Sequence, residues 1–146
     1  MSTIRWLTFR GGRTFDTSNI DPAHFVNGEA PICVARTWHR GHLLPGYVRL
    51  DSRVGYFAHR REVVKKSEYH LLFDGSLGWH EIEEGDPVPE NAVKVGWTCR
   101  EPLFLGKADV NGVELFGTVA SSVCSIATDE GVLETRRFSI LVRVRD

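Results

Sequence analysis

The sequence predicts an all-β fold made of two tandem, pseudo-symmetric β-rich repeats that form one sandwich-like domain. Short segments rich in strand-forming residues recur at even intervals, and turn residues separate them. No stretch of about 10 residues places its apolar side chains at helical spacing. An internal repeat of nearly constant offset indicates duplication of one β unit. Together these features are typical of sandwiches and closed β folds.

The first half of the chain contains five expected strands. Gly11-Gly12 favours a tight turn, and Pro45-Gly46 predicts another, because proline presets φ and glycine tolerates a positive φ. The charged stretch 59–68 is expected to form a turn or a frayed edge strand whose basic residues face solvent and discourage aggregation. The expected strands are residues 4–9, 31–38, 47–50, 54–58 and 69–73.

The second half contains six expected strands. Asn111-Gly112, between two apolar segments, is a strong hairpin signal because both residues tolerate a positive φ. Glu84-Gly85-Asp86 and Asp129-Glu130-Gly131 mark further turns. The expected strands are residues 79–82, 92–97, 103–108, 114–119, 123–127 and 137–144.

The two halves repeat the same order of parts. Lys107 lies 71 positions after Arg36, and Gly117 lies 71 positions after Gly46. We therefore expect one domain, residues 1–146, divided into a degenerate first repeat (1–75) and a second repeat (76–146). A pseudo-twofold axis would relate the repeats, with ligand grooves where they meet. Trp6 and Trp79 begin equivalent strands and are expected to anchor the core.

Composition and charge exclude several classes of protein. The net charge of −1 over 146 residues lacks the basic excess of a nucleic-acid-binding surface. No apolar run approaches the ~18–20 residues of a membrane span. The odd count of 3 cysteines, without a CxxC spacing or an apolar leader, favours a reduced compartment. We expect a cytoplasmic location, with a vesicular location or release without a signal peptide as alternatives.

No metal or cofactor is expected. His39 and His42 are the only histidines close in sequence, but they flank a turn and have no third ligand at a defining spacing. A DxDxDG calcium loop is absent. Cys33 falls on the place of Phe104 in the repeat, so we expect a small buried side chain there.

The order of tryptophan, turn glycine, Pro-x-Asn-Ala-Val-x-x-Gly and Leu-Phe-x-Gly-Lys-Ala resembles the DM-nine repeat. The second copy carries this order in Trp79, Gly85, Val88, Pro89, Asn91, Ala92, Val93, Gly96, Leu103, Phe104, Gly106, Lys107, Ala108 and Gly117. The first copy carries a more degenerate version in Trp6, Pro22, Gly28, Val34, Ala35, Arg36, Pro45, Gly46, Tyr69 and Leu72. The resemblance covers nearly the whole chain. It implies a β-rich, mannose-binding invertebrate lectin, often dimeric, that recognises microbial surfaces in innate immunity.

The resemblance also implies where sugar binds. The family's lectins use an acidic residue two places after the glycine of Asn-Ala-Val-x-x-Gly, and a lysine directly after Pro-Gly. In the second copy these places hold Thr98 and Thr118. In the first copy the lysine place holds Tyr47, and Glu29 is the only carboxylate near the acidic place. Neither copy keeps the acid–lysine pair.

A sugar site needs an apolar plane for the ring and fixed donors and acceptors for the hydroxyls. The candidate carbohydrate-binding residues are Glu29, Arg36, Tyr47, Trp97, Thr98, Lys107 and Thr118. The alternative is that Arg36 and Lys107 form hydrogen bonds or ion pairs between the repeats and that Trp38 and Trp97 fill the core.

We expect a non-catalytic, mannose-type lectin whose partners are glycans, and whose homodimer raises avidity. The alternative is a structural or protein-interaction protein that keeps the fold without the sugar. A hydrolase would need two carboxylates facing each other across ~5–10 Å, and no spacing in the sequence suggests such a pair.

Overall fold

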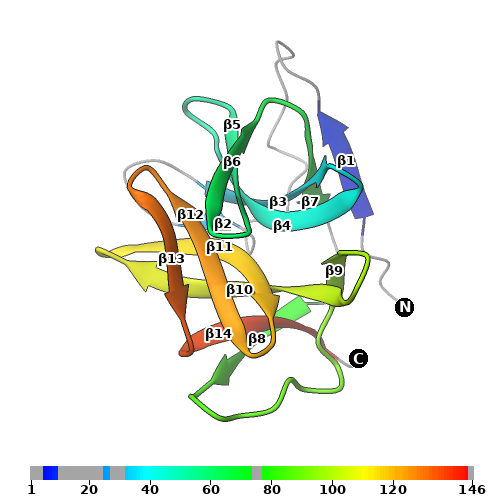
Figure 1. The fold of residues 1–146 in the computed structure, drawn as a ribbon, viewed down its shortest axis with the longest axis vertical. Coiled ribbons are helices and arrows are strands. Elements are labelled where there is room, and N and C mark those ends of the chain that lie inside the picture. Colours follow the sequence, from blue (N-terminus) through cyan, green and yellow to red (C-terminus); the bar gives the residue numbers. More distant parts are fainter. Residues whose placement is uncertain (1–4, 10–24, 27–31, 74–76, 145–146) are drawn as a thin grey trace.

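The computed structural model describes residues 5–9, 25–26, 32–73 and 77–144. These residues form fourteen antiparallel strands and no helix. The strands form one continuous, curled sheet (Figure 1). The prediction of an all-β fold is therefore confirmed.

The strands divide evenly between the two halves of the chain. The first half holds β1 (Arg5–Phe9), β2 (Phe25–Val26), β3 (Ile32–His39), β4 (His42–Arg49), β5 (Val54–His59), β6 (Glu62–Lys66) and β7 (Tyr69–Phe73). The second half holds β8 (Leu77–Ile82), β9 (Lys94–Trp97), β10 (Pro102–Val110), β11 (Val113–Ala120), β12 (Val123–Thr128), β13 (Gly131–Thr135) and β14 (Phe138–Arg143). The predicted boundary between residues 75 and 76 falls outside the described residues.

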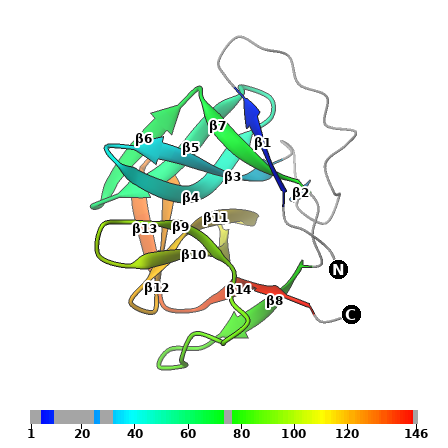
Figure 2. The same cartoon turned by 90° about the vertical axis from the view of Figure 1, so that its right-hand side faces the viewer.

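Each half pairs its strands in the same order. The first unit runs β1-β7-β3-β4-β5-β6, and the second runs β8-β14-β10-β11-β12-β13. The registers match as well: Ala35 opposes Gly46 in the first unit, and Gly106 opposes Gly117 in the second. In Figure 2 the first unit lies above the second. The sequence repeat, with its offset of 71 positions, is therefore also a structural repeat.

Strand β9 joins the two units. It pairs with β10 of its own unit, and its last residue, Trp97, pairs with Leu43 of β4 in the first unit. Gly96 permits this crossing, because a Cβ there would collide with the backbone carbonyl of Leu43. The sheet is continuous across the repeats as a result.

The core is shared between the units. Its larger cluster contains Ile32, Val34, Tyr47 and Leu72 of the first unit together with Leu105, Phe116, Val119, Ile126, Ile140 and Leu141 of the second. A smaller cluster lies mainly within the first unit and includes Cys33. Cys33 is fully buried, as predicted, and burial raises the pKa of its thiol to about 12. Such a thiol packs as an apolar side chain and is unreactive at neutral pH.

One predicted turn is wrong. Pro45-Gly46 lies inside β4, and the chain reverses earlier, at Arg40-Gly41, where both residues have positive φ. Gly46 is required for close packing, because a Cβ there would collide with the carbonyl of Tyr56 and the ring of Phe57. Proline and glycine therefore mark a crowded strand here and not a reversal.

Two edge strands carry the weakest sequence signals. Residues 62–66, expected as a turn or frayed strand, form β6, and β13 (Gly131–Thr135) was not predicted at all. Both are partly exposed and rich in charged or polar side chains. Their strand structure comes from pairing with β5 and β12, which local composition does not reveal.

We predict that Gly117→Ala lowers the free energy of unfolding by about 2–3 kcal/mol, because its Cβ would collide with the carbonyl of Ser125. Gly78→Ala is the matched control. Its Cβ would meet only the Cγ2 of Val144 at 2.9 Å, and that half-exposed side chain can move. Urea unfolding of both variants tests the prediction. Equal destabilisation would show that the close strand approach at Gly117 is not a constraint.

Candidate functional site

Two related cavities lie where the repeats meet. The first, of about 480 Å³, is lined by His42, His59, Arg60, Thr98, Arg100 and Thr118, and we call it the Thr118 cavity. It takes residues from β4 and β5 of the first unit and from the β9–β10 turn and β11 of the second. The structure thus brings together Thr98 and Thr118, the two places where the resemblance puts the sugar-binding acid and lysine.

A threonine turn builds one wall of the Thr118 cavity. The Thr98 hydroxyl oxygen accepts hydrogen bonds from the backbone N–H groups of Arg100 and Glu101, each at 3.2 Å. The Thr98 N–H in turn donates to the Glu101 carbonyl at 2.9 Å. Threonine stabilises such turns by replacing a backbone partner. The turn places the charged Arg100 and Glu101 at the cavity.

Thr118 forms part of the cavity wall and also ties the repeats together. It is 8% exposed, and its hydroxyl donates to the carbonyl of Pro45 in the first unit at 3.1 Å. A buried carbonyl without a partner would cost about 1–3 kcal/mol. Thr118 therefore has a structural role in addition to its place in the cavity.

Two histidines, His42 and His59, also line the Thr118 cavity. The His59 ring lies 5.3 Å from that of His42, which lines the cavity, and 5.2 Å from that of His39, measured between ring centroids. Burial, and then the neighbouring histidine His39, lower the pKa of His59. Burial, and then Lys66, lower that of His39. Sequence reasoning missed this cluster because His59 approaches the other two only through strand pairing.

The β5–β6 turn adds two arginines in a strained conformation. Arg60 and Arg61 have φ values of 50° and 65°, and both line the Thr118 cavity. Two-residue hairpins of this type prefer Asn-Gly, because a left-handed conformation costs other residues about 1–2 kcal/mol each. Arg61 also forms an exposed ion pair with Glu134 at 3.7 Å.

The second cavity is the pseudo-symmetric counterpart of the first. It has a volume of about 390 Å³ and is lined by Arg49, Val113, Leu115, Thr128, Asp129 and Glu130; we call it the Asp129 cavity. His39 opposes His42 as Val110 opposes Val113, so His42 and Val113 are equivalent.

The turn residues at the two cavities correspond in the same way. His59 opposes Glu62 as Thr128 opposes Gly131, which makes Arg60 equivalent to Asp129. By the same register Arg61 is equivalent to Glu130. The counterpart of the Thr98 turn, including Glu29, lies outside the described residues.

Each cavity wall also holds a buried polar atom that lacks a hydrogen-bond partner within the described part of the chain. These atoms are His42 Nδ1 at the Thr118 cavity and Arg49 Nε at the Asp129 cavity. Such atoms are uncommon in folded proteins and mark places where water or a ligand completes the hydrogen bonding.

Arg36 and Lys107 occupy equivalent places in the two units, but of the two only Arg36 contacts a described residue of the other unit. Arg36 lies 4.1 Å from the ring centroid of Trp6, and Lys107 lies 4.5 Å from that of Trp79. Cation–π contacts of this kind are worth about 0.5–2 kcal/mol. Both tryptophans pack against the shared core, as predicted.

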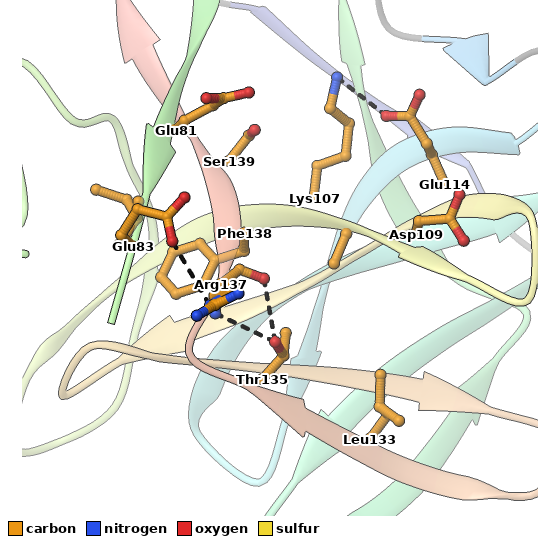
Figure 3. Close-up of a pocket in the computed structure, with 12 residues that line it drawn as sticks. Glu81, Glu83, Lys107, Asp109, Glu114, Leu133, Thr135, Arg137, Phe138 and Ser139 are labelled. Carbon is orange, nitrogen blue, oxygen red and sulfur yellow. Dashed lines mark hydrogen bonds and ion pairs between the residues drawn. The ribbon is translucent and has the colours of Figure 1, made fainter. Parts of the chain in front are cut away.

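The remaining contacts of the two cations favour structural roles. Arg36 donates to the Val95 carbonyl of the other unit at 3.0 Å, and burial lowers its pKa to about 10. Lys107 is paired with Glu114 at 3.1 Å, beside a cavity of about 540 Å³ that Glu81 and Arg137 also line (Figure 3).

Tyr47 is fully buried. Its ring stacks on that of Tyr56 at 5.3 Å between centroids, and its hydroxyl donates to the carbonyl of Ala127 in the other unit. Burial raises the pKa of the hydroxyl to about 12. The ring has no face open to a ligand, so Tyr47 supports the site from the core.

Trp97 lies at the surface and is 47% exposed. Its ring meets that of Trp38, which is 50% exposed, edge to face at 5.5 Å between centroids. The pair joins β3 of the first unit to β9 of the second. The alternative in which Trp38 and Trp97 fill the core is therefore wrong, because both rings lie at the surface.

The family model of the DM9 repeat matches residues 27–137. This match covers more than half of the chain, and the protein belongs to the DM9 repeat family, the resemblance noted in the sequence. The family is often associated with carbohydrate binding. A comparison with curated protein sequences gives no match.

The described residues include no group of three or more histidine, cysteine, aspartate or glutamate side chains that could hold a metal ion. The same part of the chain contains no helix long and apolar enough to cross a membrane.

We predict that Tyr47→Phe lowers the free energy of unfolding by about 1–3 kcal/mol, because the buried Ala127 carbonyl loses its hydrogen bond. Urea unfolding measures the change. Tyr56→Phe is the control, since the hydroxyl of Tyr56 donates to the exposed side chain of Asp129 at 2.9 Å, where water can replace it. Similar losses in the two variants would contradict the structural role of the Tyr47 hydroxyl.

The histidine cluster predicts acid sensitivity. His39 and His59 have folded-state pKa values below the ordinary 6.5. As the pH falls, the unfolded chain therefore binds more protons than the folded chain does. Their contribution to stability is present above about pH 6.5 and is lost as the pH falls toward the folded-state values. Thermal unfolding between about pH 7.5 and pH 5 should show this loss, and His59→Gln should make it shallower. An unchanged slope in His59→Gln would contradict the prediction.

Proposed function

We propose that this protein is a lectin without enzymatic activity that binds a mannose-type sugar in the Thr118 cavity. The main support for the proposal is that Thr98 and Thr118 line the same cavity. These are the two places that the resemblance assigns to sugar binding. Membership of the DM9 repeat family supports carbohydrate as the ligand class.

The size and lining of the cavity suit a sugar. Its volume of about 480 Å³ falls within the ~300–1,000 Å³ typical of small-molecule sites. Leu44 and Leu103 supply apolar surface, while Ser125 and the Thr98 turn supply polar groups. His42 Nδ1 has no hydrogen-bond partner within the described residues, so it can form a hydrogen bond with a hydroxyl of the ligand.

Charged side chains compensate for the missing acid–lysine pair. Glu101 brings a carboxylate to the cavity three residues after Thr98, and Arg100 brings a cation from the same turn. Arg60 and Arg61 add cations from the first unit. A carboxylate and a guanidinium can hold neighbouring sugar hydroxyls as an acid and a lysine do.

The exposed tryptophan pair offers a separate aromatic surface that also suits carbohydrate. Trp97 directly precedes Thr98, and the rings of Trp97 and Trp38 are both about half exposed. Aromatic faces bind the apolar face of a sugar ring. A homodimer, which the family resemblance leads us to expect, would raise the avidity for glycan-covered surfaces.

Titration with mannose and with galactose tests the proposal, read by calorimetry and by tryptophan fluorescence. Saturable binding of mannose that galactose does not reproduce is the expected result. Absence of binding at tens of millimolar sugar would reject the lectin function and favour a protein-interaction role for the exposed tryptophans.

We predict that Ala120→Tyr abolishes mannose binding. Ala120 lines the Thr118 cavity at the end of β11 and is partly exposed, so a tyrosine can fill the cavity without strain in a strand. Calorimetric titration measures the loss. Val132→Tyr, a partly exposed position at the Asp129 cavity, is the matched control and should retain binding. Retained binding in Ala120→Tyr, or its loss in Val132→Tyr alone, would place the site elsewhere.

A further inference from the structure

The two pseudo-symmetric cavities carry opposite charge on the same backbone. At the Thr118 cavity the β5–β6 turn presents Arg60 and Arg61, where the Asp129 cavity has Asp129 and Glu130. Arg100 adds a third cation to the Thr118 cavity, against one carboxylate, Glu101. Two formal positive charges therefore remain there with the histidines neutral.

The cations at the Thr118 cavity are available to a ligand. Among the described residues Arg60 and Arg100 have no ion-pair partner, and both side chains belong to exposed residues. Arg61 has only a long, exposed contact with Glu134. At the Asp129 cavity, by contrast, Lys65 lies 3.8 Å from Asp129, and the Tyr56 hydroxyl donates to the same carboxylate.

The backbone of the arginine turn supports a role in binding. Both Arg60 and Arg61 adopt the left-handed conformation, which glycine would adopt more cheaply. Among the other two-residue turns with both φ values positive, those at Arg40-Gly41 and Asn111-Gly112 place glycine second, whereas Ser121-Ser122 does not. Strained residues that persist against a cheaper alternative are often found at functional sites.

We propose that the Thr118 cavity selects sugar units that carry an anionic group, either a phosphate or a carboxylate. This inference rests on the proposed function and specifies its ligand class. Arg60, Arg61 and Arg100 bind the anionic group, since guanidinium groups match both phosphate and carboxylate geometry. The Thr98 turn and His42 contact the sugar hydroxyls. The Asp129 cavity, with the opposite charge, does not bind such sugars.

Calorimetric titrations with mannose, mannose 6-phosphate, mannuronate and inorganic phosphate test the inference. Anionic sugars should bind about tenfold or more tightly than mannose at low salt, and the ratio should fall at about 0.5 M salt. A gain with mannose 6-phosphate alone supports the inference and restricts the anion to phosphate. Inorganic phosphate should bind much more weakly than mannose 6-phosphate.

Three outcomes would overturn the inference. Equal or tighter binding of mannose would reject it while leaving the lectin function intact. Equal binding of inorganic phosphate and mannose 6-phosphate would show an anion site that does not recognise the sugar. Absence of binding by every sugar would reject the lectin function as well.

Variants of the arginines locate the effect. The double variant Arg60→Gln with Arg100→Gln should bring the ratio of the two affinities, anionic sugar to mannose, close to one. Arg53→Gln is the control, because Arg53 is also exposed and also has a positive φ, of 62°. Arg53 lies just before the first residue of β5, whereas the last residues of β5 line the cavity. It makes a single change of charge and should leave the ratio unchanged. An unchanged ratio in the double variant, or an equal fall in Arg53→Gln, would overturn the inference.

A second variant separates binding from stability. Arg61→Gly relieves the left-handed backbone, so it should raise the urea midpoint while lowering the same affinity ratio. Weaker selection in a more stable protein cannot be attributed to unfolding. If the ratio is unchanged in Arg61→Gly as well, the arginine turn has no part in ligand selection.

Discussion

The burial of the two β units against each other is the constraint on which the rest of the structure depends. Each unit is a strongly curved antiparallel sheet, and the apolar faces that the two sheets turn toward each other supply the larger core cluster. Sheets of this kind bury such a face only by packing it on another layer. The polar contacts between the units follow the same interface, from Arg36 to Val95, from Tyr47 to Ala127 and from Thr118 to Pro45.

Close backbone approach makes this packing possible. Gly46 and Gly117 lie at equivalent places in β4 and β11, where any Cβ would meet the neighbouring strand. Gly96 allows β9 to reach β4 of the other unit. These glycines keep the central strands within contact distance, and residues of the neighbouring strands and turns line both cavities. The position of the cavities is therefore a consequence of how the units pack.

Duplication supplies one backbone and two sets of side chains. The Thr118 and Asp129 cavities share strand pairing and turn position, yet one turn carries arginines and the other carboxylates. Residues in turns contribute little to the shared core, so they can change without loss of the fold. The left-handed arginines lower stability at one cavity, which is expected where a binding site is built on a stable scaffold.

Several features follow from local chemistry and were predictable from the sequence. Asn111-Gly112 forms its hairpin because both residues tolerate a positive φ, and the paired places of Arg36 and Lys107 follow from the repeat offset. The burial of Cys33 follows from its match to an apolar place in the other copy. The all-β class and the repeat thus depend on periodicity and turn chemistry, which act over a few residues.

Only the tertiary structure decided which side chains share a site. Tyr47 occupies a predicted ligand place but is buried, because β4 has neighbours on both faces, and this burial depends on residues about 80 positions away. His59 joins His42 only when β5 folds back beside β4, and Arg100 faces Arg60 only after the two units pack. The sequence alone determined most of the strands and turns and the duplication, because these depend mainly on neighbours along the chain. The cavities, their charge and the burial of Tyr47 required the folded structure, because they depend on contacts between residues far apart in sequence.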